Sequence, residues 1–408
     1  MTFLKISLRN VARNARRTTL TVFIVALGLA TLIISNALYD GFHEKMVANA
    51  VRIFMGHLQI HARGFHANPT VENCFLPLRE DVLKSAPGSP LFARRVLFQA
   101  LASTTANSLG VMVVGIDPEA ERQITLTARS IVSGSYLTTQ PEDLRSCLVG
   151  EQLFRNLHLQ LGEKIILMAQ ARDGSLAADA FRVKGVCRTG NPEMDRSFFW
   201  IPLKMAQDFL AYGEHISEIV LLARNSSQVP AIKNYLLQHT DSATTEVLSW
   251  QEVAPDIVQM IELDIAMQRI LMLIISVIAA MAIMNTMLMA IQERYPEFGV
   301  LLAIGTTPLQ IVGMVVQESF YIGLLGLAAG LALTAVASIY FFWHGVNLAS
   351  FAAGVAKFIG LDTTVRPLIK PGQVLASCLT VLAAATVTSL APALKAARMD
   401  PIQIIRHI

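Results

Sequence analysis

The stretch from Ile270 to Ile291, ILMLIISVIAAMAIMNTMLMAI, contains no charged residue. A helix needs about 20 apolar residues to cross the hydrocarbon of a bilayer, and this stretch is long enough. Three further segments share its length and apolar character, Thr18–Tyr39, Ile311–Trp343 and Gln373–Leu394, and Glu318 is the only charged residue in the four. One span, a long polar stretch and then three closely spaced spans predict a membrane protein with one large domain outside the bilayer.

Two alternatives to spanning helices are weaker. A buried helix of a soluble protein usually keeps a polar stripe, whereas Leu271–Ile283 is apolar or small on nearly every face. A cleaved signal peptide competes for the first segment, but that segment is longer than the roughly 7 to 15 apolar residues of a signal peptide and no A-x-A-like site clearly follows it. We therefore expect four transmembrane α-helices in a 1+3 arrangement, with a large α+β domain between the first and the second.

The positions of the basic residues predict the orientation of the chain. The 408-residue sequence is 53% hydrophobic and 15% charged, and its formal net charge is only +3. Basic residues precede the first span at Lys5, Arg9, Arg13, Arg16 and Arg17. Others follow the last span at Lys395, Arg398 and Arg406. Because the cytoplasmic ends of spans carry an excess of Lys and Arg, we expect both termini in the cytoplasm.

This orientation predicts nine segments in order. They are a cytoplasmic amphipathic helix at 1–17, a first span at 18–39, an extracytoplasmic domain at 40–268, a second span at 269–291, a cytoplasmic coupling loop or helix at 292–310, a third span at 311–343, an extracytoplasmic loop at 344–372, a fourth span at 373–394 and a cytoplasmic tail at 395–408. In the first segment apolar residues alternate with the basic ones at roughly helical spacing, which favours an interfacial helix over a nucleic-acid-binding arm. The alternative that these arginines only fix the orientation is equally well supported.

The extracytoplasmic domain shows short strands mixed with helices. His57–His61 alternates like a strand, and Val111–Gly115 is a β-branched run followed by a turn. Lys164–Ala169 and Phe181–Val186 alternate on either side of a polar turn, which predicts a hairpin. Helical patterns occur at Gln152–Leu157 and Leu203–Leu210. The domain is therefore expected to be α+β.

The four cysteines constrain the chain little. Cys74, Cys147 and Cys187 fall in the outer domain, where a disulfide is chemically allowed, and their odd number leaves at least one thiol unpaired within the chain. Cys378 lies in the last span, where we expect an inert small apolar residue. No C-x-x-C spacing indicates zinc or redox chemistry.

No catalytic constellation is recognisable. His57 and His61 share one face of the predicted strand and His66 follows it, but no carboxylate or thiol lies at a convincing ligand spacing, so exposed strand histidines are expected rather than a metal site. No nucleophile motif such as G-x-S-x-G occurs, and the phosphate-binding motif G-x-x-x-x-G-K-[ST] is absent from the sequence. We expect no catalytic residue, cofactor or metal on this chain, and any ATP-driven motor would be another polypeptide.

Several motifs together resemble the FtsX-like ABC transporter permeases. They are NTMLMAIQERYPEFGVLLAIG at Asn285–Gly305, Gln317–Ser319 with Gly323, Gly326 and Gly330, APALKAARMDPI at Ala391–Ile402, the basic opening from Leu8 to Thr18, and Gly115–Pro118 in the outer domain. The closest likeness is to the lipoprotein-releasing permeases of the LolC/LolE type, which share the MacB-like fold of the macrolide exporters. Length and the single large outer insertion match both the lipoprotein-releasing and the macrolide-exporter types, and GHLQIHARG at Gly56–Gly64 resembles the lipoprotein-releasing permeases. Macrolide exporters typically carry their ATPase on the permease chain, which this sequence does not.

The resemblance implies a bacterial inner membrane, with the large domain in the periplasm. It also implies a dimeric cytoplasmic ABC ATPase that binds ATP and Mg²⁺, and a second permease protomer that is the same or a related chain. The expected mechanism is mechanotransmission, in which ATP-driven closure is passed through the helices to the periplasmic domains. The expected cargo is a lipidated protein, with a possible periplasmic carrier or adaptor. The sequence does not identify the cargo or distinguish a homodimer from a heterodimer.

The inner loop is the predicted contact with the ATPase. We predict that Gln292–Gly305 forms a short amphipathic helix whose apolar face binds in a groove of the ATPase. The predicted coupling residues are Gln292, Glu293, Arg294, Tyr295, Pro296, Glu297, Phe298, Gly299 and Leu302. The alternative is an ordinary interfacial helix that connects two spans. The residues alone favour this alternative, and only the resemblance to the permease family favours contact with an ATPase.

Glu318 is costly inside a membrane, so we expect it to contact a partner within the helix bundle or to reach the cytoplasmic interface. Gly326 and Gly330 form a small-x-x-x-small face that allows close helix packing.

A lipidated cargo needs an apolar cleft, because moving acyl chains into water costs about 0.8 kcal/mol per CH₂. We expect that cleft where the first two spans leave the membrane and continue as helices. The predicted substrate-binding residues are Leu38, Tyr39, Phe42, Met46, Ile257, Met260, Ile261 and Met267. Ordinary packing between the two helices explains any single one of them equally well.

Three functions remain open at this stage: lipoprotein release, export of amphipathic small molecules or peptides with a periplasmic adaptor, and signalling to a cell-wall hydrolase. The size of the outer domain argues mildly against the third.

Overall fold

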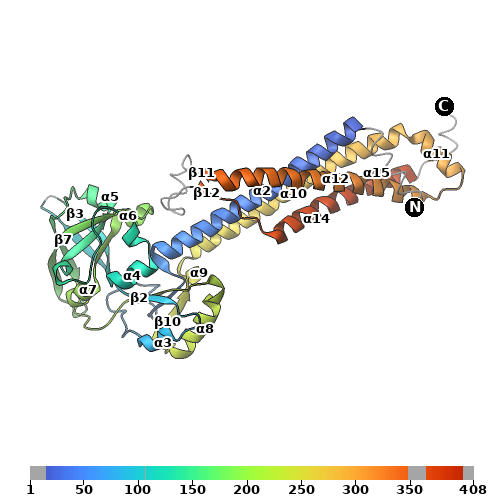
Figure 1. Ribbon diagram of the computed structural model, residues 1–408. Coiled ribbons are helices and arrows are strands. Elements are labelled where there is room, and N and C mark those ends of the chain that lie inside the picture. The colour runs from blue at the N-terminus through green and yellow to red at the C-terminus, as the bar shows by residue number, and fades with distance from the viewer. Residues whose placement is uncertain (1–14, 106, 348–363, 398–408) are drawn as a thin grey trace. The chain divides into compact units, whose positions relative to one another are not determined.

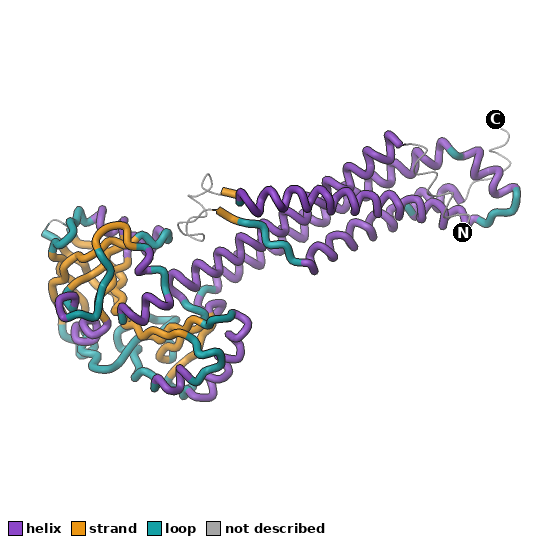
Figure 2. The backbone as a smooth tube through the Cα atoms, in the orientation of Figure 1, coloured by secondary structure: helices purple, strands orange, loops and turns teal. Residues whose placement is uncertain are grey.

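The computed structural model describes residues 15–105, 107–347 and 364–397. The chain forms two compact units (Figures 1 and 2). The helical unit comprises Met1–His43, Ile261–Val346 and Thr364–Ile408, and the domain comprises Glu44–Met260 with Asn347–Thr363. Most of the predicted N-terminal helix, loop 344–372 and tail 395–408 lie outside the described residues.

Four long helices build the helical unit, and each contains a segment long and apolar enough to cross a membrane. They are α2 (Ala15–Ala50), α10 (Pro255–Glu293), α12 (Pro308–His344) and α14 (Pro371–Thr388), which is followed by α15 (Leu390–Ala397). The predicted set of four spans is therefore confirmed. Helices α2 and α10 run well past the predicted spans, which confirms that the first two spans continue as helices beyond the membrane.

Close packing of α12 on α2 depends on two glycines. A Cβ at Gly326 would lie 2.6 Å from Cγ1 of Val25, and one at Gly330 would lie 2.9 Å from Cδ2 of Leu29 and 3.1 Å from the carbonyl oxygen of Ala26. Real Cβ atoms do not approach that closely without a shift, so only glycine fits. The predicted small-residue face is confirmed as a packing surface between these two helices.

The domain is built on a ten-stranded mixed sheet with the order β10-β1-β9-β2-β3-β8-β5-β7-β4, and β6 pairs with both β2 and β7. The strands are β1 (Leu58–Ala62), β2 (Leu91–Ser103), β3 (Ser108–Ile116), β4 (Ile131–Gly134), β5 (Ser146–Gly150), β6 (Lys164–Gln170), β7 (Leu176–Cys187), β8 (Phe198–Pro202), β9 (Glu218–Leu222) and β10 (Thr245–Ser249). Because β6 joins β2 to β7, strands β2, β3, β8, β5, β7 and β6 close into a barrel. Strands β9, β1 and β10 extend the sheet beyond β2.

The predicted strands and hairpin are confirmed. Strand β6 pairs antiparallel with β7 from Lys164↔Arg182 to Gln170↔Leu176. Its alternation buries Ile165, Leu167 and Ala169 in the barrel core. The remaining α-helices are α3 (Glu80–Lys84), α4 (Pro118–Ile124), α5 (Glu151–Asn156), α6 (Pro192–Ser197), α7 (Leu203–Phe209), α8 (Val229–His239), α9 (Trp250–Val253) and α11 (Tyr295–Ala303). Helices α5 and α7 coincide with the two predicted helical patterns.

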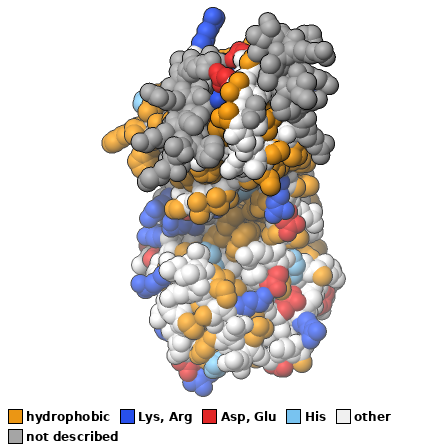
Figure 3. Space-filling model, turned by 90° about the vertical axis from the view of Figure 1, so that its right-hand side faces the viewer, with side chains coloured by type: hydrophobic (Ala, Val, Ile, Leu, Met, Phe, Trp, Pro, Cys, Tyr) orange, Lys and Arg blue, Asp and Glu red, His pale blue; other side chains and the backbone are white. Residues whose placement is uncertain are grey.

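The surfaces of the two units differ in chemistry. The helical unit exposes many large apolar side chains, including Leu273, Val336 and Trp343. In Figure 3, charged side chains of both signs are spread over the surface of the domain, and hydrophobic side chains are visible on the helices. All four cysteines are free, and Cys147 and Cys187 are buried in the domain. This contrast is the one expected for a unit that faces lipid and a unit that faces water.

Candidate functional site

The predicted coupling residues lie at one end of the helical unit, where α10 ends and α11 begins. Gln292 and Glu293 are the last two residues of α10, and Arg294 leaves helical geometry with φ −111° and ψ 14°. Pro296 stands in the first turn of α11, where its missing N–H costs nothing. The predicted single helix is thus two helices with a corner at Arg294.

Arg294 ties this corner to the next spanning helix. Its Nη1 donates to Oε2 of Glu318 on α12 over 3.2 Å, and its Nε donates to Oε2 of Glu297 over 2.8 Å. The guanidinium also lies over the Phe298 ring, 5.2 Å from its centroid. The Arg294 and Glu318 side chains are only 12% and 10% exposed. The expected contact of Glu318 within the bundle is therefore found, and its partner is the arginine of the coupling corner.

Phe298 anchors α11 in the core of the helical unit. Its side chain is buried in the cluster that contains Ile311, Met314 and Ala393. The residues that α11 and its C-terminal end present outward are instead Pro296, Val300 and Ile304. Gly299 is buried and Leu302 is half-buried, so the apolar face expected to meet a motor is used largely inside the chain.

The same end joins α2 to α10. Arg17 Nη1 lies 3.2 Å from Oε2 of Glu293, and the hydroxyls of Thr21 and Thr286 lie 2.6 Å apart in a buried contact. Side-chain hydrogen bonds between spanning helices hold them in one register. A displacement of the corner at Arg294 would therefore reach α2, α10 and α12.

Within the domain, a buried arginine fastens the segment that follows α2. This segment is a five-residue π-helical turn, η1 (Val51–Met55), which ends at Gly56 with φ 65°. Arg95 on β2 donates from Nη1 to the carbonyl oxygen of Phe54 over 2.8 Å, and its guanidinium lies 4.5 Å from the Phe54 ring centroid. A Cβ at Gly56 would lie 2.8 Å from the carbonyl oxygen of Leu221. The end of α2 is thus clamped between β2 and β9.

Two carboxylates hold Arg95 in place. Glu121 on α4 accepts from Nε over 3.0 Å and from Nη2 over 2.6 Å, and Glu218 on β9 accepts from Nη1 over 2.9 Å. Glu218 also accepts from Nε2 of His61 over 3.2 Å. Burial alone would raise the pKa of Glu218, but His61 and Arg95 lower it below its ordinary value. Burial alone would lower the pKa of Arg95, yet the two carboxylates raise it, so the guanidinium stays charged.

The expectation of exposed strand histidines is wrong for His61. Its side chain is buried, because its register partner across the strands is Glu218, and it completes the Arg95 network. His57 is half-buried, and its Nδ1 accepts from the backbone N–H of Ala223 over 3.1 Å. Burial lowers the pKa of His57. Among residues 15–105, 107–347 and 364–397, no group of three His, Cys, Asp or Glu side chains is placed to bind a metal.

The predicted substrate-binding residues divide between the two units. In the helical unit, Tyr39 and Met267 are exposed, and Leu38, Phe42 and Ile261 are half-buried. In the domain, Met46 and Ile257 are buried and Met260 is half-buried. The sequence reasoning missed a polar pair beside Tyr39 and Phe42, in which His43 Nε2 on α2 lies 2.8 Å from Oδ2 of Asp264 on α10.

Sequence reasoning also missed Arg95. The one indication in the sequence was a charged residue, Arg95, within the alternating pattern of strand β2. Alternation of buried and exposed positions does not identify the carboxylates that contact such a residue.

Four long apolar helices and a separate water-facing domain define a membrane protein with a large extramembrane domain. Residues 18–239 match the MacB-like periplasmic core domain, and residues 269–401 match the FtsX-like permease C-terminal domain. The chain belongs to the FtsX-like permeases that carry a MacB-like periplasmic core domain. It is an ABC transporter permease of the LolC/LolE/MacB type.

Its relatives are distant but nearly collinear. The lipoprotein-releasing system transmembrane protein LolC of Neisseria meningitidis serogroup B is 21% identical over 94% of this chain and 92% of its own length. LolE of Haemophilus influenzae is 20% identical, with 93% and 92% covered. The macrolide export ATP-binding/permease protein MacB of Escherichia coli is 22% identical over 98% of this chain but only 59% of its own length. These relatives and the apolar helices point to an inner-membrane protein with a periplasmic domain.

Proposed function

We propose that this chain is the permease subunit of an ATP-driven complex that releases lipoproteins from the outer leaflet of the inner membrane. The proposal rests on the sequence similarity to LolC and LolE, which extends over nearly the full length of this chain and of each relative. The likeness to MacB supports the second candidate, export of amphipathic small molecules or peptides with a periplasmic adaptor. MacB is named as both ATP-binding and permease protein, whereas this sequence contains no G-x-x-x-x-G-K-[ST] motif.

The motor in this proposal is a separate dimeric cytoplasmic ABC ATPase that binds ATP and Mg²⁺. It contacts the corner formed by Gln292, Glu293 and α11. Because Arg294 bonds to Glu318 and Phe298 is buried in the helical core, a push on α11 is transmitted to α12 rather than absorbed by a loose loop. Both termini lie in the cytoplasm in this arrangement, as the basic residues near the ends of the chain suggest.

The periplasmic part of the cycle uses the clamp at η1. Within the domain, Arg95 holds the segment after α2 through the Phe54 carbonyl oxygen, and this contact would receive a movement of α2. The cleft for acyl chains would use Leu38, Tyr39, Phe42 and Met267 in the helical unit, and a second permease protomer completes the complex.

The test is reconstitution of the chain with its ATPase and protomer partner in proteoliposomes that contain a radiolabelled lipoprotein. ATP-dependent transfer of the lipoprotein to a soluble periplasmic carrier supports the proposal, and ATP hydrolysis with no transfer contradicts it. Export of a fluorescent amphipathic dye by the same liposomes would instead support the second candidate. Reporter fusions at residue 408 and within a loop of the domain check the orientation, which is contradicted if both report the same side.

A further inference from the structure

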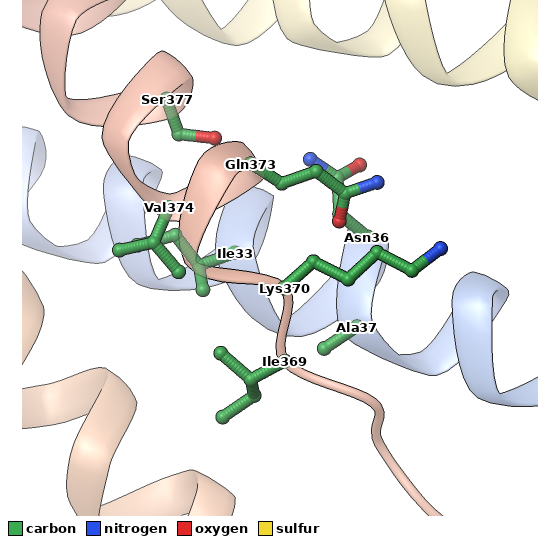
Figure 4. A pocket seen from close by; sticks show the side chains of 8 residues that line it. All are labelled: Ile33, Asn36, Ala37, Ile369, Lys370, Gln373, Val374 and Ser377. Atoms are coloured by element: carbon green, nitrogen blue, oxygen red, sulfur yellow. The ribbon is translucent and has the colours of Figure 1, made fainter.

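Hollows in the two units differ greatly in size. Figure 4 shows one in the helical unit, between α2 and α14, with Asn36, Gln373 and Ser377 among the residues that line it. It holds only about 10 Å³, which is space for about one water molecule, so it is a packing gap between two helices. A groove in the domain is much larger, at about 430 Å³, and falls within the range of roughly 300–1,000 Å³ that is typical of binding sites.

This groove, called the β2 groove below, lies at an edge of strand β2. Its walls include Leu91, Phe92, Ala93 and Arg94 of β2, Asp117, Ala120 and Gln123 at the start of α4, and Leu203 at the start of α7. Phe92 and Leu203 pack against the core of the barrel, whereas Ala93 and Ala120 belong to a separate cluster on the other face of the sheet. Because side chains from both faces of one strand line the groove, the groove runs along the edge of that strand.

The edge is open because β3 covers only part of β2. The pairing of these strands begins at Arg95↔Ile116 and continues to Ser103↔Ser108. After Ile116 the chain turns into α4, where the Asp117 carboxylate caps the helix and Pro118 has no N–H with which to continue the ladder. Residues Leu91–Arg94, about 13 Å of strand, are therefore paired only with β9.

The backbone N–H and C=O of Phe92 face this open edge. The backbone groups of successive residues in a strand point alternately toward its two neighbours. The C=O of Arg95 accepts from the N–H of Ser217, the residue before β9, so Arg95 and Ala93 direct their backbone groups toward β9 and Phe92 directs its own the other way. On that side no strand in the described part of the chain pairs with Phe92. Uncovered N–H and C=O groups of this kind are a template for another strand.

The β2 groove also carries basic side chains whose charges are incompletely matched. Arg94 Nη2 lies 3.6 Å from Oε1 of Glu80, and its Nε is buried without a hydrogen-bond partner. Glu80 also accepts from Lys84 over 2.7 Å, and the Asp117 carboxylate accepts from two N–H groups of α4. Arg224 is exposed, and no ion pair is found for it among residues 15–105, 107–347 and 364–397. The groove therefore suits a ligand that brings a carboxylate of its own.

We propose that the β2 groove binds an extended, acidic segment of another periplasmic protein, which adds to the free edge of β2 as a further strand. The N–H and C=O of the segment pair with those of Phe92, and its carboxylate lies against the arginines of the groove. Its other side chains point alternately toward Leu203 and toward Ala120. Strand addition takes its affinity from main-chain hydrogen bonds and its specificity from the side chains on either face. This binding does not depend on whether the complex releases lipoproteins or exports small molecules.

The test starts with selection of a displayed library of short random linear peptides on the full chain in nanodiscs. The enriched peptides should contain Asp or Glu among β-branched residues, and fluorescence anisotropy gives the dissociation constant of a labelled one. Arg224→Glu should weaken binding about tenfold, because it replaces a charge-assisted contact by repulsion. The matched control is Arg196→Glu, which changes an exposed arginine of α6 outside the groove and should leave binding within twofold of wild type. Equal melting temperatures of the wild type and both variants exclude misfolding.

Methylation of the peptide backbone separates strand addition from a simple charge contact. Methyl groups on the alternate amides that face β2 should abolish binding, whereas methyl groups on the intervening amides should be tolerated. Equal effects of the two methylation patterns, or unchanged binding to the Arg224→Glu variant, overturn the proposal, and so does a selection that enriches no acidic peptide. Self-association of the chain that the peptide displaces would assign the groove to a second copy of this chain and overturn the assignment to a separate protein.

Discussion

Arg95 is the side chain whose loss should damage the domain most. It is fully buried, and it donates four hydrogen bonds, two to Glu121, one to Glu218 and one to the Phe54 carbonyl. Arg95→Met removes the cation and leaves two buried carboxylates that repel each other. Removing one partner of a buried ion pair costs about 3–5 kcal/mol. For a domain of this size each kcal/mol lowers the melting temperature by about 2–4 °C, so the expected drop is roughly 6–20 °C.

The assay is thermal unfolding of the full chain in detergent, followed by tryptophan emission. Trp200 is only 1% exposed in the domain core, so its emission shifts to longer wavelength when the domain opens. Arg95→Lys keeps the charge but loses the forked geometry, and should give an intermediate melting temperature. The triple variant Arg95→Met/Glu121→Gln/Glu218→Gln removes all three charges and should recover most of the loss.

The melting temperatures of the single and triple variants show whether the Arg95 network stabilises the domain and why its loss is damaging. A melting temperature of the Arg95→Met variant within about 2 °C of wild type would show that the network contributes no net stability. A triple variant that melts no higher than Arg95→Met would show that lost packing, and not the unpaired carboxylates, causes the damage.

Three further predictions concern the corner, the glycine contact and pH. Arg294→Leu or Glu318→Leu alone should reduce ATP-driven release in the reconstituted complex more than the double variant, because each single change leaves one buried charge; equal losses in all three would contradict this. Gly326→Ala should lower the stability of the helical unit by about 1–3 kcal/mol, because the added methyl would lie 2.6 Å from a methyl of α2. Gly313→Ala on the same helix has open space and should be neutral or slightly stabilising by thermal unfolding, so similar losses in both would count against the contact. The pKa of Glu218 is lower in the folded domain, so its contribution is fully present above its ordinary pKa near 4.5 and should be lost as pH falls through the folded pKa. Melting curves of wild type and Glu218→Gln between pH 7 and pH 3 should therefore converge at the acidic end, and a constant gap would refute the assignment.

The spans and the barrel hairpin were predictable because both depend on local patterns. A long charge-free run has few stable alternatives to a spanning helix, and strict alternation at Lys164–Ala169 buries one face of a strand. The continuation of α2 and α10 beyond the spans was predicted, but not the residues at which they end, since hydropathy marks where lipid begins and not where a helix ends. The true stop after α2 is Gly56, whose positive φ ends the π-helical turn.

The contacts of the charged residues were not predictable from the sequence. Arg294 and Glu318 are separated by most of the inner loop, and Arg95, Glu121 and Glu218 come from three different elements. Their pairing depends on the crossing of helices and on strand register, which a single sequence does not encode in any short-range pattern. The burial of Phe298 was not predictable either, because the sequence does not show whether an apolar helix face contacts a partner protein or the core of its own chain.

The sequence by itself determined that this chain is a four-span membrane protein with an α+β domain and no phosphate-binding motif, because length, charge and period act locally along the chain. Only the tertiary structure decided that β6 closes a barrel, that Arg95 clamps the end of α2 and that Arg294 pairs with Glu318. Each of these features joins residues far apart in the chain. Their positions follow from how the apolar faces of helices and strands pack together, and that packing is a property of the whole fold.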